Sequence, residues 1–310
     1  MKIAIAGAGA MGSRFGYQLK KAGQDVTLID PWTDHVEAIR EHGLQVDYDG
    51  QLDSVEIPIL YPQEVTESYD LVVCFTKALG LDAMLANIKP ALGEHTRVLC
   101  LLNGLGHEKT VEKYVPAENF LIGNTIWTAG LDGPGKAHLY GSGSLALQNV
   151  VPGHEEQAKE VAELLDQAGL NATFDPNVRY SIYRKAALNG CVNGVCALLD
   201  CNLGSFGSTD SAPVIIREVV SEFAAVAAQE GIILDQPEVV SYVESIFSPD
   251  SIGEHFPSLH QDLVQKGRLT EIDFINGAIA RQAVEYGFRA PYCELITLLV
   301  HSKEQILGAK

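Results

Sequence analysis

The stretch that decides the fold is KIAIAGAGAMG, at residues 2–12. An apolar run at residues 2–6 leads directly into the motif Gly-x-Gly-x-x-Gly, and residues 14–22 then show helical spacing. A second apolar run, at residues 25–30, ends in an aspartate. This order of strand, glycine-rich turn, helix and strand within about thirty residues predicts a parallel βαβ unit.

Each glycine of the motif has a separate physical task. Gly7 permits the tight turn, Gly9 lets a pyrophosphate approach the backbone, and Gly12 allows the helix to pack closely on the strand. The amides at the start of the helix can then bind phosphate. The motif in this context favours a Rossmann-type, dinucleotide-binding domain over the alternative, an empty βαβ unit with a glycine-rich turn.

Asp30 bears on the type of dinucleotide. A carboxylate at the end of the second strand accepts hydrogen bonds from ribose hydroxyls and repels a 2′-phosphate, for which a nearby arginine would be expected. The sequence has no lysine or arginine between Lys21 and Arg40. We therefore expect NAD(H) rather than NADP(H), the alternative for Asp30 being a solvated acid at the end of a strand.

The two halves of the chain differ in pattern. Strand and helix signals alternate in the first half, and the glycine-rich segment 130–143 predicts short antiparallel strands. Strand signals nearly vanish beyond Asp175-Pro176, where helical spacing covers residues 180–199, 213–230, 237–247, 258–265, 271–286 and 291–307. The sequence thus predicts an α/β chain: a Rossmann-type NAD(P)-binding domain at residues 1–175, then an all-α substrate domain at residues 176–310.

Composition narrows the class of protein. The 310 residues are 46% hydrophobic and carry a net charge of −18, which is globular composition with a surface that repels nucleic acid and anionic membranes. No apolar run reaches the ~18–20 residues of a membrane span, and no signal peptide is evident, so we expect a cytoplasmic location. The six cysteines form no Cys-x-x-Cys pair and the histidines no zinc-type cluster, which predicts buried free thiols and no metal site.

The second half carries a polar stripe. Lys185, Asn189 and Asn193 are spaced i, i+4, i+8 and share one helix face. Asparagine is a poor helix former, so these residues are as well explained by a binding site lined with hydrogen-bond donors as by a helix face exposed to solvent. Helical spacing would place Glu271, Ile275 and Ala278 on one face, and a glutamate beside a buried lysine keeps that lysine charged. By itself, such a glutamate is more often a surface carboxylate.

Six ordered blocks resemble the ketopantoate reductase (2-dehydropantoate 2-reductase) family over nearly the whole chain. They are residues 7–12, 76–77, 102–106, 183–189 with Asn193, Ser258 with 261–262, and 270–277. The resemblance implies catalytic roles for Lys185, as general acid to the ketone oxygen, and for Glu271, which would hold and tune that lysine. It implies substrate binding by Asn103, Asn189, Asn193 and Ser258. It implies cofactor binding by Gly7, Ala8, Gly9, Ala10, Met11, Gly12, Asp30, Lys77 and Asn103.

One departure from the family pattern concerns the cofactor. Typical members look NADP-dependent, with a basic residue after the second strand, whereas this chain has Asp30-Pro31-Trp32. That resembles the NAD-using branch, which includes D-2-hydroxyacid dehydrogenases such as D-mandelate dehydrogenase. Three hypotheses follow: reduction of ketopantoate to pantoate, as in pantothenate biosynthesis; reduction of bulky branched or aromatic 2-ketoacids; or dinucleotide binding without catalysis.

Two further expectations concern the helical half. His260, next to Ser258, is interpreted as a helix-surface histidine rather than a site residue. The apolar segments at residues 223–228 and 295–300 could either complete a monomer core or form a homodimer face.

Overall fold

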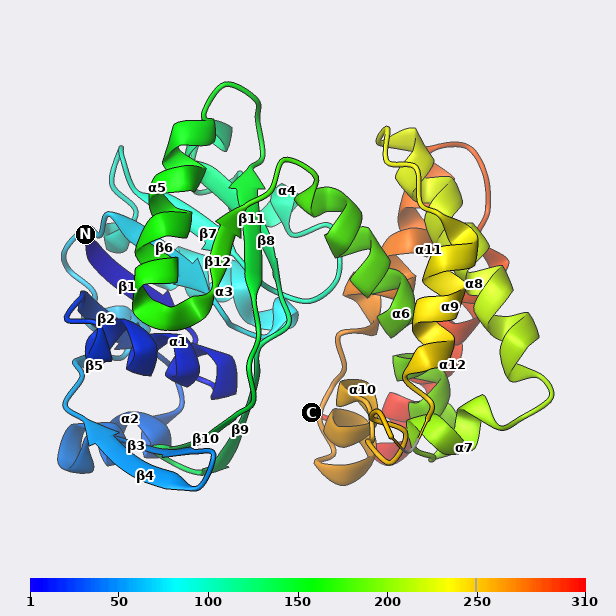
Figure 1. Ribbon diagram of the computed structural model, residues 1–310, viewed down its shortest axis with the longest axis horizontal. Helices are drawn as coiled ribbons and strands as arrows, with labels where there is room; N and C mark the ends of the chain where they lie inside the picture. The colour runs from blue at the N-terminus through cyan, green and yellow to red at the C-terminus, as the bar shows by residue number, and fades with distance from the viewer. Residues whose placement is uncertain (249) are drawn as a thin grey trace. The chain divides into compact units, whose positions relative to one another are not determined.

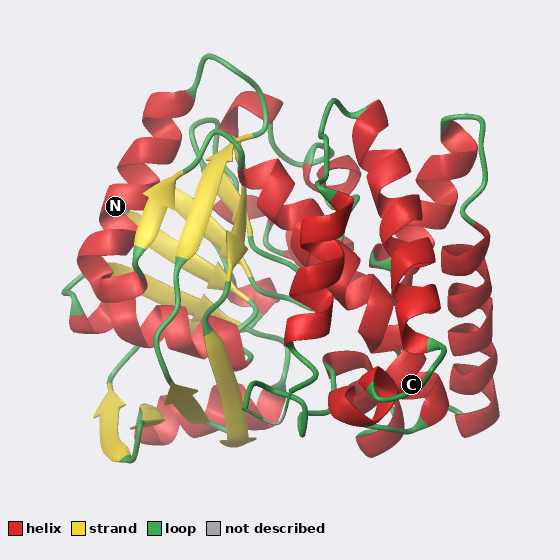
Figure 2. Ribbon diagram, turned by 45° about the vertical axis from the view of Figure 1, so that its right-hand side comes forward, coloured by secondary structure: helices red, strands yellow, loops and turns green. Residues whose placement is uncertain are grey.

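The computed structural model describes residues 1–248 and 250–310, and the chain divides there into two units. The first comprises Met1–Leu102 and His107–Val178, and the second comprises Asn103–Gly106 and Arg179–Lys310. Figure 2 shows strands in the first unit and helices throughout the second. This confirms the predicted fold class, whereas the boundary between residues 175 and 176 stays a prediction.

A mixed sheet forms the centre of the first unit (Figure 1). Its strand order is β12-β11-β8-β7-β6-β1-β2-β5. The predicted strand β1 (Lys2–Ala6) lies inside the sheet, parallel to β2 (Asp25–Ile29) and β6 (Leu71–Cys74). The other strands are β5 (Ile59–Leu60), β7 (Arg97–Cys100), β8 (Phe120–Thr125), β11 (Leu145–Asn149) and β12 (Ala172–Phe174). The order reverses between β1 and β6, which is where open α/β sheets bind their ligands.

The helices of this unit pack on the sheet. They are α1 (Ala10–Lys21), α2 (Thr33–His42), α3 (Leu81–Asn87), α4 (Glu108–Val111) and α5 (Glu155–Leu165). Helix α1 contacts β1 and β2, and α5 contacts β11 and β12. The connection from β1 through α1 to β2 is the predicted βαβ unit, with the helix beginning four residues earlier than its apolar spacing indicated.

A smaller second sheet has the order β4-β3-β10-β9. It comprises β3 (Leu44–Tyr48), β4 (Gln51–Val55), β9 (Thr128–Gly133) and β10 (Lys136–Tyr140). Strands β9 and β10 pair in antiparallel fashion around a glycine-proline-glycine turn, as the segment 130–143 predicted. Helix α1 contacts β9, β10, β3 and β4, so the helix that follows the glycine-rich turn is covered by this sheet.

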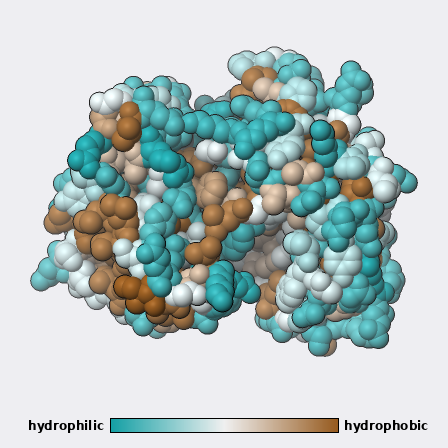
Figure 3. Space-filling model, turned by 180° about the vertical axis from the view of Figure 1, so that it is seen from behind, coloured by the Kyte–Doolittle hydropathy of each residue, from teal (hydrophilic) through white to brown (hydrophobic). Residues whose placement is uncertain are grey.

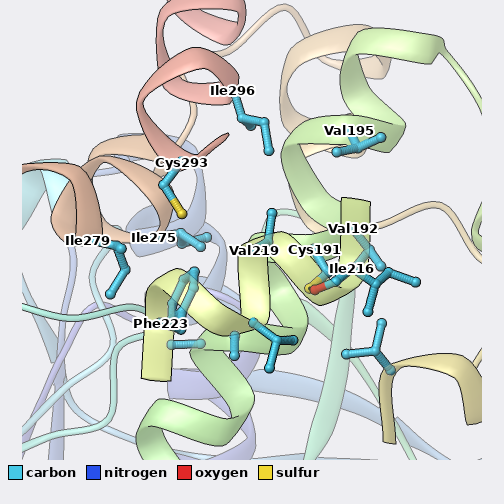
Figure 4. Close-up of a cluster of buried hydrophobic side chains, with 14 of the residues drawn as sticks. Cys191, Val192, Val195, Ile216, Val219, Phe223, Ile275, Ile279, Cys293 and Ile296 are labelled. Carbon is cyan, nitrogen blue, oxygen red and sulfur yellow. The ribbon is translucent and has the colours of Figure 1, made fainter. Parts of the chain in front are cut away.

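The second unit contains helices and no strand over its described residues. Its α-helices are α6 (Val178–Leu199), α7 (Leu203–Gly207), α8 (Ala212–Gln229), α9 (Gln236–Ser245), α10 (Ser258–His260), α11 (Asn276–Glu285) and α12 (Pro291–Leu307). Its core, shown in Figure 4, joins Cys191, Val192 and Val195 of α6 to side chains of α8, α11 and α12. Over residues 1–248 and 250–310, no helix is both long and apolar enough to cross a membrane.

The two apolar segments singled out in the sequence have different environments. Phe223, Val226 and Ala227 of α8 are fully buried and belong to the core. Leu295 and Leu299 of α12 are 56% and 46% exposed, and Figure 3 shows apolar side chains gathering on the surface of the helical unit. The first segment therefore completes the core, and only the second is available as an interaction face.

Candidate functional site

The glycine-rich turn has the geometry of a phosphate-binding loop. Gly7 has φ +100°, and a Cβ there would lie 2.6 Å from the Thr76 backbone nitrogen. A Cβ on Gly12 would lie 1.9 Å from the Gly7 carbonyl oxygen, whereas one on Gly9 would meet nothing within 4 Å. Two glycines therefore allow the turn itself, and the third leaves open space at the N-terminus of α1, where backbone amides are available to an anion.

Asp30 is fixed beside this turn. It directly follows β2, and its Oδ2 accepts a hydrogen bond of 2.7 Å from the Ala8 amide. Its Oδ1 accepts a second bond, of 2.9 Å, from the Trp32 amide. Each carboxylate oxygen retains a further lone pair. The carboxylate is thus oriented by the turn that would hold the pyrophosphate, as a ribose-binding acid requires.

The cations that flank Asp30 in sequence are engaged elsewhere. Lys21 forms an ion pair of 2.9 Å with Asp53. Arg40 pairs with Glu64 and donates to the Ile59 carbonyl at 3.2 Å. Neither of these two cations is paired with Asp30.

Lys77 and Asn103 follow neighbouring strands of the main sheet, β6 and β7, and both side chains are exposed. The loop that carries Asn103 packs with the second unit: the Leu105 amide donates to the Phe274 carbonyl at 2.7 Å. Gly104 has φ +92°, and a Cβ there would lie 2.2 Å from the same carbonyl oxygen. Only glycine permits this approach, so the position of Asn103 depends on the segment around Phe274.

The predicted polar stripe lies on one long helix, α6. Lys185 and Asn189 are half-buried and Asn193 is buried, which rules out a fully solvated face. Loss of solvent around the Lys185 ammonium lowers its pKa to about 8. An amine with this pKa can give up and regain a proton near neutral pH, which an ordinary surface lysine does not do.

Ser258 lies against the same stripe. It begins α10, directly after Pro257, and Asn193 Nδ2 donates to its Oγ at 3.3 Å. Two residues that are 65 positions apart thus present an amide and a hydroxyl together. These groups can recognise carboxylate and hydroxyl oxygens of a small substrate.

Glu271 is placed differently from the sequence prediction. The predicted single helix over residues 271–286 is wrong, because the Phe274 carbonyl accepts from Leu105 and Ile275 has φ −113° and ψ −99°. A short 3-10 turn, η7 (Ile272–Phe274), precedes α11, so Glu271, Ile275 and Ala278 do not share a helix face. Glu271 is nevertheless buried, with an exposed fraction of 6%. Its φ of −92° and ψ of 22° are those of the turn that leads into η7.

The η7 turn packs on α6 beside the polar stripe. A Cβ on Gly194 would lie 3.3 Å from Ile272 Cδ1, and Asn276 Nδ2 donates to the Gly190 carbonyl at 3.0 Å. The two glycines of α6 therefore bring the segment after Glu271 against the turns of α6 that carry Asn189 and Asn193.

Two buried polar residues, His260 and Arg14, have partners that the sequence does not indicate. His260 is buried rather than on a helix surface, and its Nε2 lies 2.7 Å from Asp200 Oδ1. Arg14 of α1 is fully buried, donates to the Thr128 carbonyl at 2.7 Å and lies 4.0 Å above the Trp127 ring. These pairings join residues that are distant in sequence, so no local pattern indicates them.

Comparison with known proteins decides the family. A sequence model described as ketopantoate reductase PanE/ApbA matches residues 3–152, and the model of its C-terminal part matches residues 177–304. The chain belongs to the ketopantoate reductase family. The two matches contain every candidate cofactor, substrate and catalytic residue named above.

Relatives in this family resemble the chain along its full length. A 2-dehydropantoate 2-reductase of Lactococcus lactis is 54% identical and covers 100% of both chains. One of Pyrococcus horikoshii is 33% identical over 99% of both chains. Among solved structures, a ternary structure of D-mandelate dehydrogenase with NADH and anilino(oxo)acetate has 52% identity, full coverage of both chains and a TM-score of 0.96.

Proposed function

We propose that this protein is a nicotinamide-dependent 2-ketoacid reductase that converts ketopantoate to pantoate. The observation that carries the proposal is the Lys185-Asn189-Asn193 stripe of α6, with its hydrogen bond to Ser258 and its lysine of lowered pKa. Support also comes from the 54% identity to the 2-dehydropantoate 2-reductase of Lactococcus lactis.

The dinucleotide belongs, in this proposal, to the first unit. The turn formed by Gly7, Ala8, Gly9, Ala10, Met11 and Gly12 would hold the pyrophosphate, with Lys77 near the cofactor. Open space beside Gly9 and the Asp30 carboxylate fit these parts of the molecule. When bound, a reduced nicotinamide supplies the hydride that reduces the ketone carbon.

The residues of the second unit hold the substrate and move the proton. Lys185 donates a hydrogen bond to the ketone oxygen, stabilises the negative charge that develops there, and transfers its proton to that oxygen. Asn189, Asn193 and Ser258 bind the carboxylate and hydroxyl groups. Glu271 keeps the lysine charged and oriented, and Asn103 positions substrate and nicotinamide.

We further propose that NADH is the preferred cofactor. The Asp30 carboxylate, oriented by Ala8 and Trp32, would repel a 2′-phosphate, and the flanking cations Lys21 and Arg40 are engaged with other acids. The similar D-mandelate dehydrogenase structure contains NADH.

A second candidate function has its own supporting observation. The same D-mandelate dehydrogenase is 52% identical to this chain and was solved with anilino(oxo)acetate. Bulky branched or aromatic 2-ketoacids are therefore the alternative substrates, and they would use the same lysine chemistry.

Steady-state rates separate the candidates. Ketopantoate, phenylglyoxylate and 2-ketoisocaproate are compared, each with NADH and with NADPH at matched concentrations. A kcat/KM for ketopantoate well above the other two supports the first function, and the reverse order supports the second. NADH binding without turnover of any 2-ketoacid would reject both and favour a non-catalytic dinucleotide-binding protein.

The exposed apolar face of α12 supports one more proposal, that the protein forms a homodimer. Leu295, Leu298 and Leu299 are each about half exposed on one helix. Covering such leucines against a second copy would remove apolar surface from water.

A further inference from the structure

A buried carboxylate near the end of α12 holds the residue that precedes Glu271. Glu304 is only 7% exposed and Thr270 only 2%. Glu304 Oε1 accepts a hydrogen bond of 2.8 Å from the Thr270 amide and another of 2.7 Å from the Thr270 hydroxyl. The Thr270 hydroxyl in turn accepts from the Ile272 amide at 3.3 Å. Both neighbours of Glu271 in the chain are therefore tied into one buried network.

Other positions of the segment 267–274 bond to the end of α12 or to Lys310 after it. The Lys310 amide donates to the Gly267 carbonyl at 3.1 Å, and the Leu269 amide donates to the Lys310 carbonyl at 3.4 Å. Further along, His301 Nε2 lies 3.1 Å from Asp273 Oδ2. The segment is thus bound at successive positions to the last turns of α12 and the residues after it.

The far end of this segment carries the Asn103 loop. The Phe274 carbonyl accepts from the Leu105 amide at 2.7 Å, and Gly104 packs directly against that carbonyl. All these residues lie in the second unit. Glu304 therefore fixes a segment that has Glu271 near one end and supports Asn103 at the other.

We propose that Glu304 is a positioning residue of the reaction, acting through Thr270 to hold the backbone of Glu271 at the turn before η7. This inference rests on the proposed function, in which Glu271 keeps Lys185 charged and oriented. A carboxylate suits the task because one of its oxygens can accept two donors. An apolar residue at position 304 would leave the amide and hydroxyl of Thr270 buried without that acceptor.

A mutant cycle tests whether Glu304 acts through Glu271. Glu304→Leu, Glu271→Gln and the double variant are purified, and kcat and KM are measured with NADH and the best 2-ketoacid. We expect Glu304→Leu to lower kcat at least about tenfold in the native background. We expect a loss of no more than about twofold in the Glu271→Gln background, because groups that act as a unit are not additive. KM for NADH is recorded in every variant as well, because the same segment supports Asn103, which positions the nicotinamide in the proposed function.

Two further variants alter the contact between Glu304 and Thr270 by smaller steps, and they apply even if Glu304→Leu folds poorly. Glu304→Gln retains an acceptor oxygen of the same shape and should keep kcat within about threefold of the native value. Thr270→Val keeps the backbone bond but removes the hydroxyl, and should lower kcat severalfold. Val243→Ala, which should open a cavity beneath α9, is the stability control: it should lower the melting temperature while leaving kcat within about twofold.

The outcomes separate this inference from the proposed function. Equal losses from Glu304→Leu in both backgrounds, or no loss, overturn the positioning role while the function stands. Full activity in Glu271→Gln would instead remove the assigned role of Glu271, and with it the positioning inference, whatever Glu304→Leu does.

Discussion

A single methyl group on Gly9 should weaken binding of the dinucleotide without disturbing the fold. Gly9 has a negative φ of −60°, and a Cβ built there meets nothing within 4 Å. Gly9→Ala should therefore change the free energy of unfolding by no more than about 0.5 kcal/mol. The methyl group would occupy the space through which a pyrophosphate must approach the amides of α1. Losing one charge-assisted hydrogen bond costs about 1.5–3 kcal/mol, so NADH affinity should fall about 10- to 100-fold.

The loss of NADH affinity can be measured by thermal unfolding of the native protein and of Gly9→Ala in the presence of NADH. At a concentration 100 times the native Kd, NADH should stabilise the native protein by about 2.7 kcal/mol. A variant with tenfold weaker binding should gain only about 1.4 kcal/mol, and the loss of about 1.3 kcal/mol corresponds to about 2 °C in melting temperature for a chain of this length. Direct titration of NADH fluorescence gives the two Kd values independently.

Gly12→Ala is the matched comparison. Its Cβ would lie 1.9 Å from the Gly7 carbonyl oxygen, so the backbone must move and unfolding should become easier by about 3 kcal/mol or more. Gly9→Ala should thus impair NADH binding and not stability, whereas Gly12→Ala should impair the packing of the turn on α1. Native NADH affinity in Gly9→Ala would refute the placement of the pyrophosphate beside this residue.

Three further predictions address charge and assembly. Lys185, with its pKa of about 8, must be protonated to reduce a ketone, so kcat/KM for reduction should fall as the pH rises through about 8. The kcat/KM for oxidation of the hydroxyacid should rise over the same range. A kcat/KM for reduction that stays level up to about pH 10 contradicts this prediction. Asp30→Asn keeps an acceptor but loses the charge, and should raise the NADPH-to-NADH ratio of kcat/KM at least about tenfold; an unchanged ratio would remove Asp30 as the selector. Leu299→Glu should convert the dimer to a monomer in light scattering, while Leu52→Glu, at an exposed leucine of β4, should not; a native mass equal to one chain rejects the dimer.

Local sequence patterns were sufficient to predict much of the fold. The strand at residues 2–6 and its glycine-rich turn were predictable because apolar continuity and the glycine spacing both lie within one short stretch. The helix over α6 was predictable for the same reason, and so was its polar stripe, since i, i+4, i+8 spacing fixes one face.

Long-range contacts account for what the sequence did not predict. The pattern after Glu271 is helical, yet the chain breaks at Ile275 because the Phe274 carbonyl is taken by the Leu105 amide, 169 residues earlier. Glu304 looks like an ordinary polar position of an amphipathic helix until its partner Thr270 is known. The spacing of apolar residues indicates which face of a helix is buried. It does not indicate which distant group donates a hydrogen bond to a buried carboxylate.

Steady-state kinetics of Lys185→Ala with NADH show whether Lys185 is the general acid of a 2-ketoacid reductase. We expect kcat on the best 2-ketoacid to fall at least about 10²-fold, with NADH binding unchanged. Turnover equal to that of the native protein would contradict it.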